Sequence, residues 1–131
     1  MQDVEVHTVG RIDREIYKCI TEDIVTDEVI ITDERLKHIQ ERHPEAYEST
    51  IEYVANIIQN PDYIISDEKH DNTGLVFRRN ADAKKQLMLV FRVCVSVDVK
   101  GYKNSIISSW VISENRLKNY LKNKKILYKR E

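Results

Sequence analysis

Glycine, cysteine and proline are all scarce in this sequence. It has three glycines among 131 residues, and Gly10, Gly74 and Gly101 are too scattered for a Walker loop or a dinucleotide fingerprint, which need closely spaced glycines. The two cysteines, Cys19 and Cys94, form neither a CxxC motif nor another metal-ligand spacing, so we expect reduced structural thiols. The sequence therefore predicts no metal site and no cofactor.

Long apolar runs are also missing. The N-terminus lacks the cationic start and apolar run of a secretory signal, and no window approaches the roughly 18 apolar residues that span a membrane. We therefore expect a cytoplasmic protein that does not enter a membrane. The chain is 41% hydrophobic and 33% charged, which is the composition of one compact domain covering residues 1–131.

The sequence has no large excess of acidic or basic residues, because its net charge is only −1. The charge is nevertheless distributed unevenly. Residues 1–71 hold 18 acidic and 7 basic side chains, a balance of −11, whereas residues 72–131 hold 4 and 14, a balance of +10. The basic half could form a surface that attracts polyanions. Equally, the two halves could pack beside each other.

Two helices are predicted in the first half of the chain, on either side of Pro44. A proline disfavours helical geometry in the residue before it, so the first helix should end near Arg42 and the second should begin at Pro44 or the next residue. Either residue of the pair 32–33 can cap the first helix. The second helix has one apolar stripe and ends at the Asn-Pro pair 60–61.

The second half alternates apolar and polar residues between turn sequences, which is typical of β-strands. Four strands joined by short loops are expected over 63–66, 75–79, 86–97 and 105–113. A short basic helix follows over 113–125, and the last residues could add an edge strand. We therefore predict an α+β fold, with N-terminal strands and helices packed on a four-stranded antiparallel meander and a short C-terminal helix. In the N-terminal part, the segments 4–12 and 15–20 also alternate and could be two strands that form a small hairpin.

The first helix carries the residues best suited to phosphate chemistry. At about 100° per residue, Arg35, His38 and Arg42 fall within a sector roughly 60° wide. Cleaving RNA without a metal needs a base, an acid and cations, and histidine and arginine supply these functions. The alternative is a surface helix whose arginines pair with glutamates at 34, 41 or 45. Spacing alone does not separate the two interpretations.

His43 lies beside Pro44 and projects towards the apolar side of the first helix. A structural role at the junction between the helices is the favoured interpretation, and His43 stays a second candidate for acid or base. His38 and His43 diverge by roughly 140° on a straight helix, which argues against a shared metal. His7 and His70 stand alone and are expected to be ordinary surface residues.

The meander adds further cations and hydroxyls. Arg92 lies in the middle of an apolar strand, where it needs either a buried ion pair or a phosphate. A contact with phosphate or RNA is also predicted for five residues in the neighbouring strands and loops: Arg78, Lys100, Ser108, Ser109 and Trp110. The two serines could instead be satisfied within the sheet, and the tryptophan could be a core residue rather than a base-stacking one.

The order of these parts resembles the barnase, EndoU, colicin and RelE-like nuclease superfamily, in its phage-associated branch. The most specific segment is R-x-x-H-I-x-x-R-H, formed here by Arg35, His38, Ile39, Arg42 and His43. The resemblance covers the chain from about residue 9 to residue 121. It includes a final strand of the form IleIleSerSerTrp. It implies a ribonuclease-type active site on the open face of an antiparallel sheet, with helices on the other face.

Carried onto this sequence, the resemblance implies that His38 is the principal acid or base, with Arg35 and either Arg42 or His43 nearby. It implies that Ser108 is the hydroxyl of the last strand, and Arg92 matches a basic residue in a central strand. Such a site requires the serine and Arg92 to face the same cleft as His38.

The leading hypothesis is a metal-independent endoribonuclease-like domain that acts by 2′-hydroxyl attack, as a phage-associated toxin or processing module. Its partners would be RNA and a protein inhibitor or a phage protein. One alternative is a nucleic-acid-binding module without catalysis. The other is a structural or interaction protein of phage origin.

Overall fold

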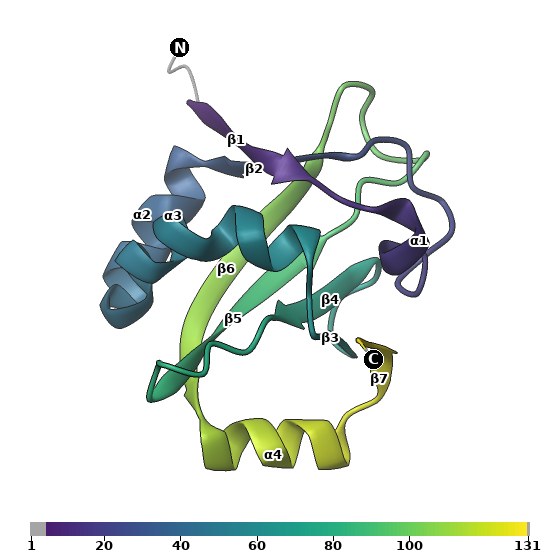
Figure 1. Ribbon diagram of the computed structural model, residues 1–131. Coiled ribbons are helices and arrows are strands. Elements are labelled where there is room, and N and C mark those ends of the chain that lie inside the picture. Colours follow the sequence, from purple (N-terminus) through teal and green to yellow (C-terminus); the bar gives the residue numbers. More distant parts are fainter. Residues whose placement is uncertain (1–4, 131) are drawn as a thin grey trace.

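The computed structural model describes residues 5–130 and has an α+β architecture (Figure 1). The described strands are β1 (Val6–Arg11), β2 (Glu28–Thr32), β3 (Tyr63–Ser66), β4 (Thr73–Phe77), β5 (Lys85–Arg92), β6 (Asn104–Ser113) and β7 (Ile126–Lys129). The described helices are α1 (Arg14–Tyr17), α2 (Asp33–Arg42), α3 (Pro44–Gln59) and α4 (Glu114–Asn123). The predicted fold class is therefore confirmed.

The strands form one mixed sheet in the order β1-β2-β6-β5-β4-β3-β7. Strands β3 to β6 pair antiparallel with their neighbours in the chain, as expected for a meander. The prediction of a four-stranded sheet is wrong, because three more strands extend it at both sides. Strand β2 pairs in parallel with β6, and β7 pairs with β3.

The predicted N-terminal hairpin is also wrong. Strand β1 pairs with β2 instead, with a register shift between Thr8 and Gly10. The alternating segment after β1 forms the short helix α1, whose first turn Asp13 caps through the backbone N–H of Glu15. Tyr17 explains the difference, because its side chain is fully buried and its hydroxyl donates to a backbone carbonyl of α3.

The two long helices follow the sequence prediction. Thr32 caps α2 by accepting a hydrogen bond from the backbone N–H of Arg35 at 3.2 Å. Pro44 is the first residue of α3, where its missing N–H costs nothing. The backbone of His43, at φ −138° and ψ 60°, makes the bend between the helices. Together they place α2 in contact with β2 and β6, and α3 across one sheet face.

Two apolar clusters lie on opposite faces of the sheet. The larger one joins α3 to residues such as Leu89 and Phe91 of β5. The smaller one joins α4, through the fully buried Leu117, to Met88 and other residues of the opposite face. The face that carries Arg92 is therefore partly core as well, and α4 leaves only part of it open. Within residues 5–130, no helix is both long and apolar enough to cross a membrane.

Candidate functional site

Helix α2 presents Arg35 and His38 to solvent. Its apolar residue Ile39 is fully buried against the larger cluster, so the opposite side of the helix faces outward. The two side chains line a shallow hollow with Glu34, Lys37 and Glu41. Among residues 5–130, Lys37 rather than an arginine pairs with Glu41, at 4.0 Å between Nζ and Oε1. The expected arrangement of exposed cations around His38 is therefore present, and Arg42 is exposed too.

His43 lies apart from this hollow and contacts the sheet. Its ring centroid is 6.2 Å from that of Trp110 in β6, with the ring planes tilted by 45°. Both side chains are half-buried, and they line one hollow with Arg116 and Tyr120 of α4. The structure thus gives His43 the predicted place at the helix junction and also brings its imidazole to the edge of the open sheet face.

A second hollow, of about 350 Å³, lies next to the first and shares two of its lining residues. Trp110 and Tyr120 line both hollows, so we treat the two as one surface and call it the Trp110 groove. Its floor comes from the strands and is formed by Val90, Ile107, Ser108 and Trp110. Its walls are α4 and the turn between β3 and β4. The groove therefore joins the last strand of the meander to the helix junction.

Both cationic and acidic side chains line this groove. Lys69 from the β3–β4 turn and Lys124 from the end of α4 line the second hollow, and Arg116 lines the first. The Nζ atom of Lys124 lies 5.1 Å from the ring centroid of Tyr120, which fixes the lysine beside the groove. Three acidic residues, Glu45, Asp67 and Glu68, line the groove as well. Cationic side chains of this kind can hold phosphate oxygens, and aromatic rings can stack on bases.

The two neighbouring serines of β6 have different environments. Ser108 is half-exposed and lies on the same face as Trp110, because each pairs across the sheet with a groove-side residue of β5. Ser109 points to the other face, where it is fully buried and its Oγ is 2.6 Å from Oγ1 of Thr50 in α3. The predicted RNA contact by Ser109 is therefore wrong, because its hydroxyl is enclosed in the core.

Arg92 forms the ion pair that was one of its two predicted roles. Its guanidinium makes two hydrogen bonds to the carboxylate of Asp98, at 2.8 and 2.9 Å. The aspartate also accepts from the backbone N–H of Val95 at 2.9 Å. The Arg92 guanidinium and this N–H lower the pKa of the Asp98 carboxyl to about 2. Arg92 lies on the groove side of the sheet, but its charge is compensated within the β5–β6 loop.

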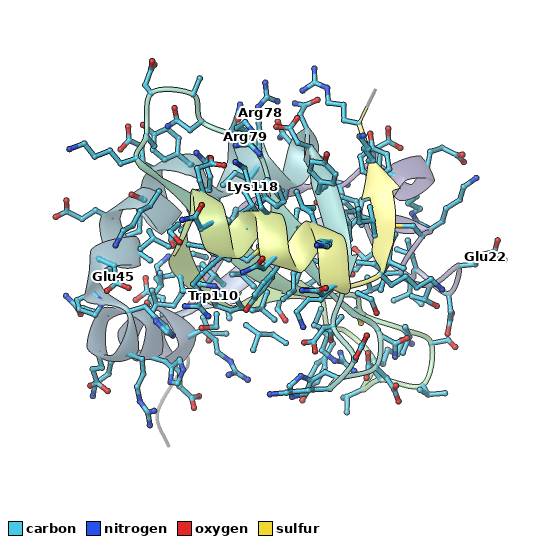
Figure 2. All side chains as sticks on the ribbon, turned by 90° about the horizontal axis from the view of Figure 1, so that it is seen from below. Glu22, Glu45, Arg78, Arg79, Trp110 and Lys118 are labelled. Atoms are coloured by element: carbon cyan, nitrogen blue, oxygen red, sulfur yellow. The ribbon has the colours of Figure 1, made fainter. Side chains whose placement is uncertain are left out.

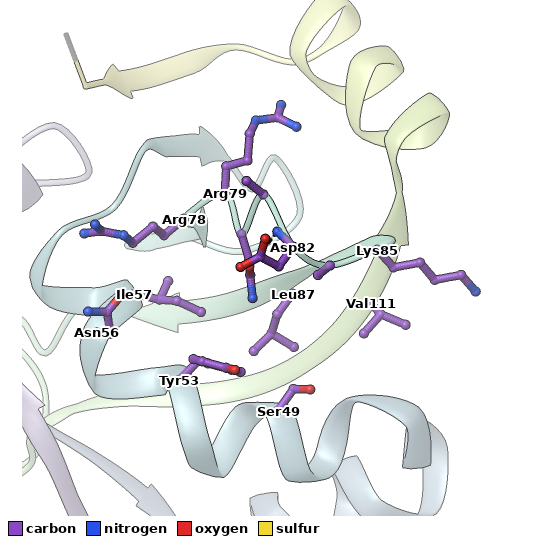
Figure 3. A pocket seen from close by; sticks show the side chains of 13 residues that line it. Ser49, Tyr53, Asn56, Ile57, Arg78, Arg79, Asp82, Lys85, Leu87 and Val111 are labelled. Carbon is purple, nitrogen blue, oxygen red and sulfur yellow. Dashed lines mark hydrogen bonds between the residues drawn. The ribbon is translucent and has the colours of Figure 1, made fainter.

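Other predicted residues lie outside the groove. Figure 2 shows Arg78 on one side of α4 and Trp110 on the other. Arg78 donates to the backbone carbonyl of Asn60 at 3.2 Å and lines a hollow between α3 and the β4–β5 loop (Figure 3). Lys100 is exposed in the loop between β5 and β6. His38 lines a hollow that contains only residues of α2, so the shared cleft expected for His38, Ser108 and Arg92 is not what the structure shows.

Comparison with known proteins decides the family. The model of the phage-Barnase-EndoU-ColicinE5/D-RelE like nuclease2 family matches residues 4–129. The chain belongs to this nuclease family. The resemblance inferred from the motif of α2 is thereby confirmed. No match was found among curated proteins or among solved structures. Membership of a nuclease family supports a nucleic-acid substrate for this nuclease-like domain.

Sequence reasoning did not place His70 in the site. His70, expected to be an ordinary surface residue, lines the groove together with Ser108 and Trp110. Its Nδ1 is 3.1 Å from Oδ2 of Asp67, three residues earlier. The spacing of an aspartate and a histidine in a turn directly after a strand was the available signal. It could not show that this turn forms a wall of the groove.

Two other groups of reactive side chains lie elsewhere. Potential metal-ligand atoms of Glu5, His7 and Asp33 lie within 4.8 Å of one another, and the hydrogen bond of 2.6 Å between His7 and Asp33 accounts for much of this arrangement. Both cysteines are free. Burial raises the pKa of the Cys19 thiol to about 11, which makes it a poor nucleophile at neutral pH.

Proposed function

We propose that this protein is an endoribonuclease that cleaves RNA without a metal ion, by attack of the 2′-hydroxyl on the adjoining phosphorus. The observation that carries the proposal is the contact between His43 and Trp110 at the edge of a groove that contains Ser108 and the cationic side chains of Arg116 and Lys124. These groups supply a proton-transfer site, an aromatic platform for a base and a hydroxyl for a phosphate oxygen. Membership of a nuclease family is a second, independent support.

Within this proposal, His43 replaces His38 as the principal acid or base. The imidazole of His43 borders the groove, whereas His38 lies in a hollow of α2 alone. An acid or base must reach its proton directly or through one water. Arg35, His38 and Arg42 then serve as an exposed cationic surface that binds the RNA backbone beside the groove.

Ser108 donates its hydroxyl to a non-bridging oxygen of the scissile phosphate. Lys124 and Arg116 lie along the same groove and offset the negative charge that develops at phosphorus in the transition state. Trp110 stacks on a neighbouring base and sets the position of the backbone. Such stacking is tolerant of base identity, so the groove should accept several sequences.

The decisive experiment compares a labelled single-stranded RNA with its all-deoxy counterpart in the presence of EDTA. We expect cleavage of the RNA to a 2′,3′-cyclic phosphate end and no cleavage of the DNA. H43Q should lower kcat by about 100-fold or more, while H38Q should lower it by less than about 5-fold. Thermal unfolding of both variants checks that the fold is intact.

Five results would overturn parts of this proposal. Loss of activity in EDTA or equal cleavage of DNA would exclude 2′-hydroxyl attack without a metal. A large loss in H38Q with little loss in H43Q would move the site to α2. RNA binding by a wild type that never cleaves would indicate a nucleic-acid-binding module, and absence of RNA affinity at low salt would indicate an interaction protein.

A toxin role follows from the same chemistry and has its own test. Expression of the wild type should arrest growth of a bacterial host and degrade its RNA, whereas H43Q should be tolerated at the same protein level. Equal growth of the two strains would favour a processing enzyme with a narrow substrate over a toxin.

A further inference from the structure

The turn between β3 and β4 holds a carboxylate and an imidazole in a fixed relationship. Asp67 directly follows β3, and its side chain is only 13% exposed, whereas the side chain of His70 is 68% exposed. One oxygen of Asp67 lies 3.1 Å from Nδ1 of His70. The other accepts from the backbone N–H of Lys69 at 2.9 Å. Both oxygens of the carboxylate are thus engaged, and the turn itself holds the pair together.

This contact defines which nitrogen of His70 can exchange a proton. A carboxylate accepts the hydrogen of Nδ1–H, which fixes the tautomer of the ring and leaves Nε2 to act on a substrate. The same carboxylate compensates the positive charge of the ring when both nitrogens are protonated. The contact therefore leaves one defined nitrogen, Nε2, for proton transfer to a substrate.

His70 and His43 approach the same groove from the two sides of β6. His43 lies at the α2–α3 junction, and α2 contacts β6 and β2. His70 comes from the β3–β4 turn, on the side of β6 where β5, β4 and β3 follow in the sheet. Trp110 lies between them, since it contacts His43 and lines the same hollow as His70. Ser108 shares that hollow.

We infer that His70 is the general acid of the reaction, positioned by Asp67, and that it complements His43 as the base. This inference rests on the proposed function. His43 removes the proton of the 2′-hydroxyl, and the resulting oxygen bonds to phosphorus. The bond between phosphorus and the 5′-oxygen breaks, and Nε2 of His70 gives its proton to that oxygen. The products are a 2′,3′-cyclic phosphate and a free 5′-hydroxyl, and proton transfer through solvent restores both histidines.

The chain contains a matched control for this pair. His7 is also hydrogen-bonded to an aspartate, with Nε2 2.6 Å from Oδ1 of Asp33, and its side chain is 41% exposed. It lines a separate hollow with apolar residues of β1, β2, α2 and α3. H7Q therefore removes a histidine of the same kind from a place where the reaction has no need of it.

The test measures H70Q, D67N and H7Q on two substrates in EDTA. On RNA, H70Q should lower kcat by about 100-fold or more with KM changed less than about 3-fold, and it should remove the alkaline limb of the pH–rate profile. D67N should lower kcat on RNA by less than H70Q does, because the ring keeps its proton donor but loses the carboxylate that fixes its position. H7Q should behave as the wild type.

The second substrate is uridine 3′-(4-nitrophenyl phosphate), whose leaving group departs without a proton. H70Q should cleave this ester at nearly the wild-type rate, whereas H43Q should stay impaired. An H70Q variant that keeps its activity on RNA, or that loses activity equally on both substrates, would overturn the assignment of His70 while leaving the proposed function intact. A wild type that cleaves neither substrate would overturn both.

Discussion

The hydroxyls of Thr50 and Ser109 lie 2.6 Å apart in the core, where they join α3 to β6. Thr50 also lies 2.7 Å from the backbone carbonyl of Ala46, which can only accept. The single hydroxyl hydrogen of Thr50 therefore goes to Ala46, and Ser109 donates to Thr50. Ser108 and Trp110 flank Ser109 and point to the opposite face, so this buried bond holds the strand that forms the groove floor.

The direction of this hydrogen bond predicts unequal effects of two substitutions. S109A should lower the free energy of unfolding by about 1 kcal/mol, because Thr50 keeps its bond to Ala46. T50V should cost more, about 1–3 kcal/mol, because it leaves the buried hydroxyl of Ser109 without its acceptor. Urea denaturation of both variants measures the difference. Equal losses, or a larger loss in S109A, would contradict the assigned donor.

The pair of Arg92 and Asp98 predicts a stability difference that depends on pH. D98N should lower the free energy of unfolding at pH 7 by about 1–3 kcal/mol, because the guanidinium loses its charged acceptor. The lowered pKa of Asp98, about 2 against an ordinary 3.8, means that the stabilisation is complete above pH 4 and is lost as the pH falls through 2. Urea denaturation at pH 7 and at pH 3 measures the difference in unfolding free energy between the wild type and D98N, which should be smaller at pH 3.

Asp82 supplies the control for this experiment, because it is exposed in the β4–β5 loop. D82N should leave the unfolding free energy within about 0.5 kcal/mol of the wild type at both pH values. A D98N deficit that stays constant down to pH 2 would show that the ion pair is not its cause.

Trp110 is the only tryptophan, so its fluorescence reports on the groove directly. We expect a non-cleavable 2′-O-methyl RNA to quench this fluorescence when a base stacks on the indole. W110A should weaken binding of the same RNA by about 1–3 kcal/mol, whereas W110F should keep most of the affinity. Fluorescence anisotropy of a labelled RNA gives the affinities. Equal affinities of wild type and W110A would remove stacking from the proposal.

The exposed arginines of α2 predict the salt dependence of RNA binding. R35A and R42A should each reduce the slope of log K against log salt by about 0.7, the value for one lost phosphate contact to a single strand. K84A changes a lysine of the β4–β5 loop, away from the groove, and should leave the slope unchanged. Binding isotherms at several salt concentrations test this expectation, and unchanged slopes in both arginine variants would exclude α2 from the RNA path.

Local signals in the sequence predicted most of the elements, whereas long-range pairing was out of their reach. The proline at 44 and the Asn-Pro pair at 60–61 bound α3 as expected, because proline acts on its immediate neighbours. The parallel pairing of β2 with β6 joins residues far apart in the chain, such as Val29 and Asn104. Alternation of apolar residues cannot specify such a partner. The same limit explains why α1 was mistaken for a strand.

For the candidate site, too, the sequence predicts the local features but not the long-range ones. The helical spacing of Arg35 and His38 correctly predicts a shared, exposed side of α2. Which of two adjacent serines faces the groove depends on a register shift in the pairing of β5 with β6, after Val90. His70 and Ser108 line one hollow because of the order of the four strands β6-β5-β4-β3 in the sheet. Neither feature leaves a local trace in the sequence.

Strand β7 has a consequence for association between copies of the chain. It forms one edge of the sheet, it has only four residues, and its pairing with β3 shifts register between Ile64 and Ile65. Basic side chains crowd this edge, since Lys124 and Lys125 precede the strand and Lys129 and Arg130 close it. A second molecule that tried to add its own β7 here would meet a short, irregular ladder and like charges. The edge should therefore resist sheet extension between molecules, so that concentrated protein stays free of fibrous aggregates.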